Sequence, residues 1–188
     1  MVLGVGGCGS GSDFDGLVER ELARGVAVNE LFLGYELGMP KEAFYDHSWD
    51  LNRQGLVMQG PRNLTVQYEL EDVLPHPAKM FYYPDFYDEK IFQMRVRFLY
   101  DGWAPWNTDL WSDSLQVHVI DLMEEWYGDG FFEYARTQES FGENVSYVKV
   151  DGTRRIVVAR ESDSEVLAVF TDLLAERKIE QEQAGNSQ

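Results

Sequence analysis

The sequence predicts an α+β fold in which two helix-plus-three-strand units form an antiparallel sheet with the helices packed on one face. Apolar and polar residues alternate over 64–70 and 92–100, which is typical of strands with one buried and one wet face. Two short amphipathic patterns, starting at Pro40 and near Ser112, each precede a region of strands. The halves share no residue-level identity, so the repetition is predicted from element order alone.

In the first unit, a weakly helical segment over 16–30 precedes a clearer helix. Pro40 suits the first turn of that helix, Glu42 lies near its positive end, and Gly55 ends it. Three strands are expected to follow, at 64–70, 80–83 and 92–100, the middle one bounded by Pro75, Pro77 and Pro84.

The second unit begins with a helix near Ser112 or Asp113, and Gln116 lies three residues after Asp113 as in a capping box. Its apolar stripe consists of Leu115, Val119, Leu122 and Trp126. Strand candidates follow at 131–135, 145–150, 153–160 and 165–170, with Asp151 and Gly152 forming a tight hairpin turn.

The predicted organisation has three parts. Residues 1–15 form a lipobox-like segment and flexible tether. Residues 16–174 form the α+β domain, with units at about 31–102 and 109–173. Residues 175–188 form a polar tail.

Acidic residues outnumber basic ones by 33 to 16, which gives a net charge of -17. Such a surface repels a polyanion, so nucleic acid is excluded as a partner. A 44% hydrophobic content excludes a disordered acidic tail. Only five of the basic residues are lysines, and the carboxylates are scattered, a composition that indicates adaptation to high salt. An ordinary acidic protein is the alternative.

The only cysteine, Cys8, follows small residues and precedes a Gly/Ser stretch, which resembles a bacterial lipobox. The charged and apolar regions of a signal peptide are missing, so we expect the true start to lie upstream. This predicts a lipid-anchored protein of the cell envelope that faces the periplasm or the exterior. A cytoplasmic protein with an incidental cysteine is the alternative. Gly4, Gly6 and Gly9 match a dinucleotide-binding spacing, but too little strand precedes them.

No catalytic, metal-binding or cofactor-binding motif is evident. His47, His76 and His118 are too dispersed for a local metal motif. No G-x-S-x-G elbow is present. A pair of carboxylates that meet only in the folded chain would allow a hydrolase, which is the least favoured hypothesis.

Two groups of residues form the candidate binding surface. Trp103, Trp106 and Trp111 lie in the connection between the units, and some of these rings are expected at the surface as anchors for a partner. On the wet face of the sheet, Gln67 and Glu69 are expected to form cross-strand pairs with Arg95 and Arg97, and this face is the second docking candidate.

The stretch Leu33-Gly34-Tyr35-Glu36-Leu37-Gly38-Met39-Pro40-Lys41-Glu42-Ala43-Phe44, followed by antiparallel strands, resembles the opening of uncharacterised lipoproteins of the Bacteroidetes lineage. More distantly, the order of elements is similar to the helix-plus-sheet unit of the outer-membrane assembly lipoprotein family SmpA/OmlA and of the β-lactamase inhibitor protein. The resemblance implies a periplasmic binding or scaffold module without catalysis.

The leading hypothesis is therefore a non-catalytic envelope lipoprotein that binds another envelope protein, with its lipid anchor in the membrane. The alternative is a carbohydrate-binding module that uses the same aromatic residues, with hydrogen bonds from carboxylates and Asn107 to a glycan.

Overall fold

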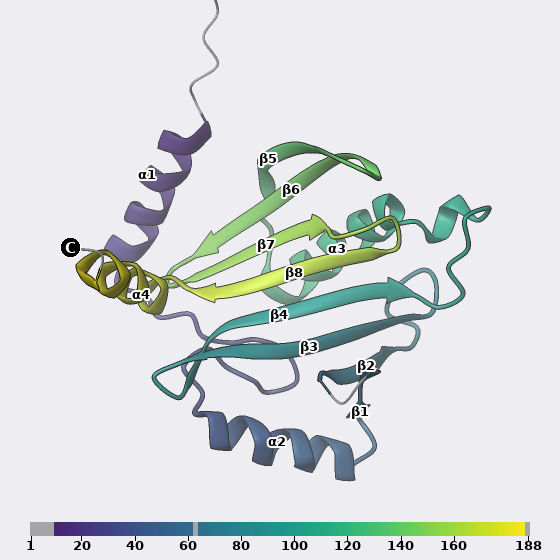
Figure 1. The fold of residues 1–188 in the computed structure, drawn as a ribbon, viewed down its shortest axis with the longest axis horizontal. Coiled ribbons are helices and arrows are strands. Elements are labelled where there is room, and N and C mark those ends of the chain that lie inside the picture. The colour runs from purple at the N-terminus through teal and green to yellow at the C-terminus, as the bar shows by residue number, and fades with distance from the viewer. Residues whose placement is uncertain (1–9, 62–63, 187–188) are drawn as a thin grey trace, which may run out of the picture.

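The computed structural model describes residues 10–61 and 64–186, and in that part of the chain it has four α-helices and an eight-stranded antiparallel sheet (Figure 1). The prediction of an α+β fold with an antiparallel sheet is confirmed. The helices are α1 (Ser10–Ala23), α2 (Lys41–Arg53), α3 (Ser112–Tyr127) and α4 (Leu173–Asn186), and a 3-10 turn, η2 (Thr108–Leu110), precedes α3. The strands are β1 (Met58–Gln59), β2 (Val66–Leu70), β3 (Ala78–Tyr87), β4 (Lys90–Tyr100), β5 (Phe132–Glu139), β6 (Gly142–Asp151), β7 (Arg154–Arg160) and β8 (Glu165–Asp172).

The strand order is β1-β2-β3-β4-β8-β7-β6-β5. Consecutive strands are neighbours in both halves, starting from one edge with β1 and from the other edge with β5. Each half is a meander of four strands preceded by a helix, and the halves join where β4 pairs with β8. The second half has the four strands that the sequence indicates at 131–170, one more than a helix-plus-three-strand unit, and the first half has one strand that the sequence did not indicate. The extra strand of the first half, β1, has only two residues, which is too short for alternation to reveal.

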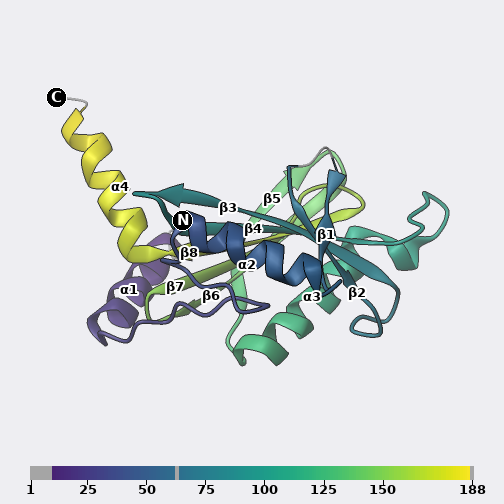
Figure 2. The ribbon, with the colours of Figure 1, turned by 90° about the horizontal axis from the view of Figure 1, so that it is seen from below.

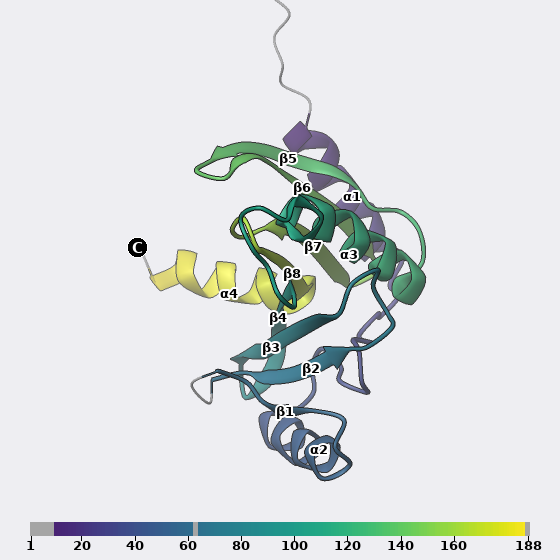
Figure 3. The same ribbon diagram turned by 90° about the vertical axis from the view of Figure 1, so that its right-hand side faces the viewer.

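The main core lies on one face of the sheet, where α2 and α3 cover it. Phe44 and Leu51 of α2 and the apolar stripe of α3 pack on buried residues that alternate along β3, β4, β7 and β8. The segment before α2 also fills this core, because Tyr35 is 1% exposed and its hydroxyl lies 2.8 Å from Ser48 Oγ of α2. Figure 3 shows α3 over the middle of the sheet, beside β7, and α2 at the edge that β1 and β2 form.

The expectation that all helices share one face is wrong for α1. Phe14 and Val18 of α1 form a second cluster with Val148 of β6. Val148 is paired with Val157 of β7, whose neighbours Ile156 and Val158 belong to the main core. Because side chains alternate along a strand, α1 packs on the opposite face. Valines on the outer face of β6 and β7 provide the surface that α1 covers.

Both ends of the described chain differ from the predicted tether and tail. Cys8 lies outside the described residues, but α1 already begins at Ser10 and Phe14 is buried. Residues of the predicted polar tail belong to α4, whose first turn is capped because Asp172 Oδ1 accepts hydrogen bonds from the backbone N–H groups of Leu174 and Ala175. Arg177 of α4 forms an ion pair with Glu19 of α1. Figure 2 shows α4 projecting from the end of the sheet near α1.

Two local expectations also change. Gln116 does not cap α3; its Nε2 donates to the backbone oxygen of Val145 at 2.8 Å and so links α3 to β6. Pro84 does not end the third strand, because β2 stops opposite Tyr82 and β3 continues beyond it as an edge strand, where proline is tolerated. The predicted turn at Asp151 and Gly152 is confirmed, since Asp151 pairs with Arg154.

Candidate functional site

An exposed apolar groove lies between α2 and the short strands at the edge of the sheet. Helix α2 buries Phe44 and Leu51 against the sheet, which turns Tyr45 and Trp49 outward, one turn apart. Because β2 covers β3 only as far as Tyr82, α2 lies along the part of β3 that follows. The ring of Tyr83 is 5.8 Å from that of Phe44, so the edge of β3 is in contact with the helix.

The groove has a volume of about 320 Å³ and its walls come from three segments of the chain. Tyr45 and Trp49 of α2 form one side, Met58 and Leu64 another, and Tyr83 of β3 closes one end. Trp49 is 67% exposed and Leu64 is 66% exposed, although both are large apolar side chains. Folded domains rarely expose several such residues at one place unless a partner covers them, so this cluster is a candidate interaction surface.

The polar groups of the groove are neutral. The hydroxyls of Tyr45 and Tyr83 are 2.7 Å apart, and burial together with this contact raises the pKa of Tyr83 to about 12. No described residue that lines the groove carries a charge at neutral pH. Carboxylates lie next to it on α2, where Asp46 is exposed and Asp50 pairs with Arg53. Because Arg53 neutralises Asp50, the groove is an apolar channel with one exposed carboxylate, Asp46, following Tyr45 on the helix.

The predicted tryptophan surface is present only in part. Trp106 is 86% exposed, whereas Trp103 is half-buried and packs against the main core. Trp111 is half-buried at the start of α3, and its ring nitrogen has no hydrogen-bond partner in the described part of the chain. One of the three rings is thus freely available at the surface.

The predicted polar face of the sheet is real, but its pairing differs from the expectation. Gln67 is in register with Phe81, which is in register with Arg97, so these residues project from one face. Strand β3 separates β2 from β4, and therefore no ion pair joins them. Instead Gln67 donates to Glu69 at 2.6 Å, and Arg97 pairs with Glu161, which raises the pKa of its guanidinium.

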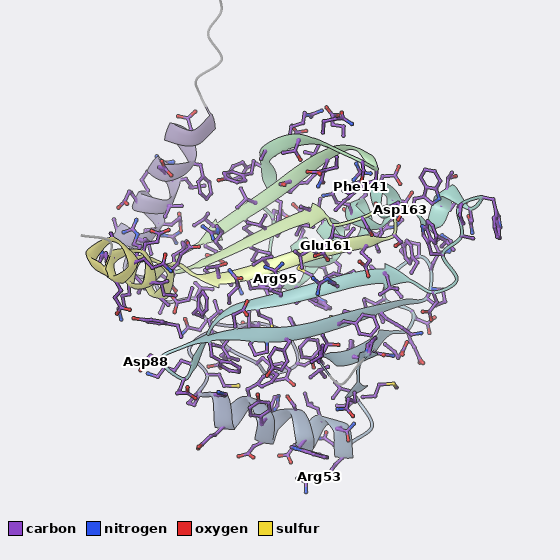
Figure 4. All side chains as sticks on the ribbon, in the orientation of Figure 1. Arg53, Asp88, Arg95, Phe141, Glu161 and Asp163 are labelled. Carbon is purple, nitrogen blue, oxygen red and sulfur yellow. The ribbon has the colours of Figure 1, made fainter. Side chains whose placement is uncertain are left out.

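Arg95 lies on the same face, in register with Tyr83 on β3 and Val169 on β8, and has no polar partner among the described residues (Figure 4). No helix lies in front of it in the view of Figure 4. This face remains a second surface open to a partner.

The described residues contain no group of three or more His, Cys, Asp or Glu side chains that could hold a metal ion. Among the described residues, no carboxylate lines the groove. Glu30 is the one carboxylate that lines a cavity of about 280 Å³ beside α3. Asp163 is the one carboxylate that lines a cavity of about 480 Å³ at the start of α3. A glycoside hydrolase needs two carboxylates across one cleft, and none of these three cavities offers them.

The groove residues Tyr45, Trp49, Met58, Leu64 and Tyr83 were not identified from the sequence. One signal was available: Phe44, Tyr45 and Trp49 give a short helix more aromatic rings than one buried stripe needs. Which of these rings stays exposed depends on how far β2 extends along β3. A local sequence pattern does not predict that length, because it is set by tertiary structure.

Comparison of the chain with family models, curated proteins and solved structures gives no match. Across 10–61 and 64–186, no helix is long and apolar enough to cross a membrane. The function is therefore argued from the site itself.

Proposed function

We propose that this protein is a non-catalytic binding module of the cell envelope that docks another protein in the groove beside α2. The observation that carries the proposal is the set of large apolar side chains left exposed there, above all Trp49. Tryptophan and tyrosine are the residues that most often dominate binding energy at protein interfaces. The absence of paired carboxylates from the three cavities supports a binding role over hydrolysis.

The partner has a definable chemistry. Neutral, apolar walls fit a segment with apolar anchor residues, and the exposed carboxylate of Asp46 on α2 favours a basic residue flanking those anchors. The net charge of -17 acts in the same direction, because it attracts basic surfaces and repels acidic ones. We infer that the partner presents apolar side chains with lysine or arginine next to them.

In this proposal the two helix-plus-sheet units have different roles. The unit of α2 and β1–β4 carries the groove, and the unit of α3 and β5–β8 supports it by completing the sheet. A lipid on Cys8 would hold the domain at a membrane, which places its partner in the envelope. The small residues around Cys8 support this location.

Affinity capture from native membranes tests the groove. The full chain is used as bait in three forms: wild type, Trp49→Ala and Trp106→Ala. The two variants remove equally large exposed rings, so Trp106→Ala is a matched control. Loss of a buried interface tryptophan costs about 2 kcal/mol or more, which weakens binding about thirtyfold.

We expect one basic partner to be recovered by the wild type and by Trp106→Ala, and to be lost with Trp49→Ala. A partner that Trp49→Ala retains and Trp106→Ala loses would move the docking site to the tryptophan connection. Recovery of the same proteins by all three baits would contradict a role for either ring.

A further inference from the structure

The face of the sheet that points away from α2 and α3 is only partly covered. Helix α1 packs on β6 and β7 there, and Figure 1 shows the middle of β4 and β8 without a helix in front of it. Half-buried apolar side chains on this face alternate with the buried ones of the main core and belong to neither hydrophobic cluster: Phe81, Leu99, Leu167 and Val169. We call this part of β3, β4 and β8, together with Arg95 and Arg97, the outer face.

Arg95 lies at the centre of the outer face and lacks a counter-ion. It is half-buried, and it is in register with Tyr83 on one side and Val169 on the other. Two other arginines on this side of the sheet, Arg97 and Arg155, each donate to a glutamate, at 2.8 and 2.5 Å. A guanidinium that is partly removed from water favours a carboxylate, which it binds through two parallel hydrogen bonds. None of the described residues supplies that carboxylate to Arg95.

The borders of the outer face admit a narrow partner. Figures 2 and 3 show α4 and α3 on opposite sides of the sheet, so α4 stands at one end of the outer face, and Figure 3 shows the β5–β6 hairpin reaching out on the side of α4. The strands β3, β4, β8 and β7 lie side by side, and spacings of about 4.8 Å give a floor about 14 Å wide. This width accepts one α-helix, which has a diameter of about 10–12 Å with its side chains. A broad, flat partner would meet α4 and the hairpin first.

A helix also fits the chemistry of the outer face. The side chains of Arg95, Leu167 and Val169 line none of the three cavities described above, so they favour a macromolecule over a small molecule. Helices are the elements that cover the apolar face of a sheet in α+β folds. The net charge of -17 repels acidic surfaces. The carboxylate that Arg95 lacks is therefore expected on a helix whose stripe is otherwise apolar.

We propose that the outer face binds an amphipathic helix of a partner protein, whose apolar stripe packs on Leu167 and Val169 and whose aspartate or glutamate pairs with Arg95. The outer face meets the groove beside α2 at Tyr83, but the two surfaces have opposite charge preferences. The groove favours a basic residue next to apolar anchors, whereas the outer face favours an acidic one.

Calorimetric titration of the full chain at about 0.5 M salt tests the site, since this salt screens the net charge of the chain. The probes are three synthetic helices of about 18 residues, which are about 27 Å long and match the roughly 26 Å of β8, a strand of 8 residues. All have the same leucine stripe and the same Glu–Lys pairs on the far face, and they differ at one position beside the stripe, which is Glu, Gln or Lys. We expect the Glu helix to bind about tenfold more tightly than the Gln helix, and the Lys helix to bind most weakly.

Charge reversal at position 95 is the decisive comparison. With Arg95→Glu the order should invert, so that the Lys helix binds most tightly. Arg53→Glu is the matched control, because it makes the same change at an exposed arginine of α2, and it should leave the order unchanged. Trp49→Ala should also leave the order unchanged, so that failure of the groove and failure of the outer face are distinguishable. If a thermal melt shows that Arg95→Glu is unfolded, Arg95→Met carries the test, and the Glu and Gln helices should bind it equally well.

The proposal is overturned if none of the three helices binds the wild type with a dissociation constant below about 1 mM. It is also overturned if the order seen with the wild type persists in Arg95→Glu and Arg95→Met. Loss of binding in Trp49→Ala would place the helix in the groove and would equally overturn the proposal.

Discussion

The side chain of Lys149 on β6 forms hydrogen bonds to the C-terminal end of α3. Its substitution gives a quantitative test of how much this contact contributes to the free energy of unfolding. The side chain is 7% exposed, and its ammonium donates to the backbone oxygens of Tyr127, Gly128 and Asp129 at 2.8, 2.6 and 2.7 Å. The last carbonyls of a helix lack partners within the helix and carry its negative end, so a buried cation satisfies them in both respects.

The substitution Lys149→Met keeps the apolar stem and removes the charge. Each hydrogen bond to a charged group contributes about 1.5–3 kcal/mol, so the three bonds set an upper bound of several kcal/mol. Gly128 and Asp129 are exposed residues, so water can replace part of the loss at their carbonyls, and the desolvation cost of the ammonium is recovered. We therefore expect a net destabilisation of about 2–3 kcal/mol.

Urea denaturation at fixed salt measures this loss. With a slope of about 2–3 kcal/mol per molar urea, the midpoint should fall by roughly 1 M. Lys178→Met is the matched control, because Lys178 is exposed on α4, and its effect should stay within about 0.5 kcal/mol. Equal midpoints for Lys149→Met and the wild type would refute the assigned role of Lys149.

Three further predictions concern backbone geometry, pH and salt. Gly152→Ala should destabilise by about 3 kcal/mol in the same assay, because φ is +55° and an added Cβ would lie 2.3 Å from the Val26 backbone oxygen; Gly25→Ala, with φ of +65° and open space, should cost only about 1 kcal/mol. Burial raises the pKa of Tyr100 from 10.0 to about 12, so its contribution to stability is complete below pH 10 and is lost as the pH rises from 10 to 12. The free energy of unfolding of Tyr100→Phe, measured by urea titration, should therefore fall less between pH 10 and pH 12 than that of the wild type. Identical pH profiles for the two proteins would contradict the role of Tyr100 burial. Raising salt from about 0.1 to 1 M should increase the melting temperature, because screening relieves the repulsion among the carboxylates of a chain with a charge of -17, and a decrease would count against adaptation to high salt.

The sequence predicted those elements whose hydrophobic pattern is set by local geometry. The alternation in β4 and the stripe in α3 mark one buried face each, and both elements appear at nearly the expected residues. Gln116 shows where this reasoning ends. Its spacing from Asp113 matches a capping box, but its side chain bonds to β6, which is distant in sequence and invisible to a local pattern.

The candidate site depended more strongly on tertiary structure than the fold did. The sequence indicated that some of the three tryptophans in the connection are exposed, but not which ones: Trp106 is exposed, whereas Trp103 packs against the core. The groove beside α2 exists because β2 stops at Tyr82 and leaves the rest of β3 to the helix. The length of one edge strand thus decides whether Tyr83 and Trp49 line a site or lie in a core.

Site-specific photo-crosslinking in the native cell tests the central claim most directly. A benzophenone amino acid replaces Leu64 at the edge of the groove or, as a control, Val117, which is 57% exposed on the outer face of α3. Docking in the groove predicts a single crosslinked protein from position 64 that disappears when Trp49→Ala is added, and none from position 117. A crosslink from position 64 that persists with Trp49→Ala, or the same product from both positions, would contradict the proposed docking site.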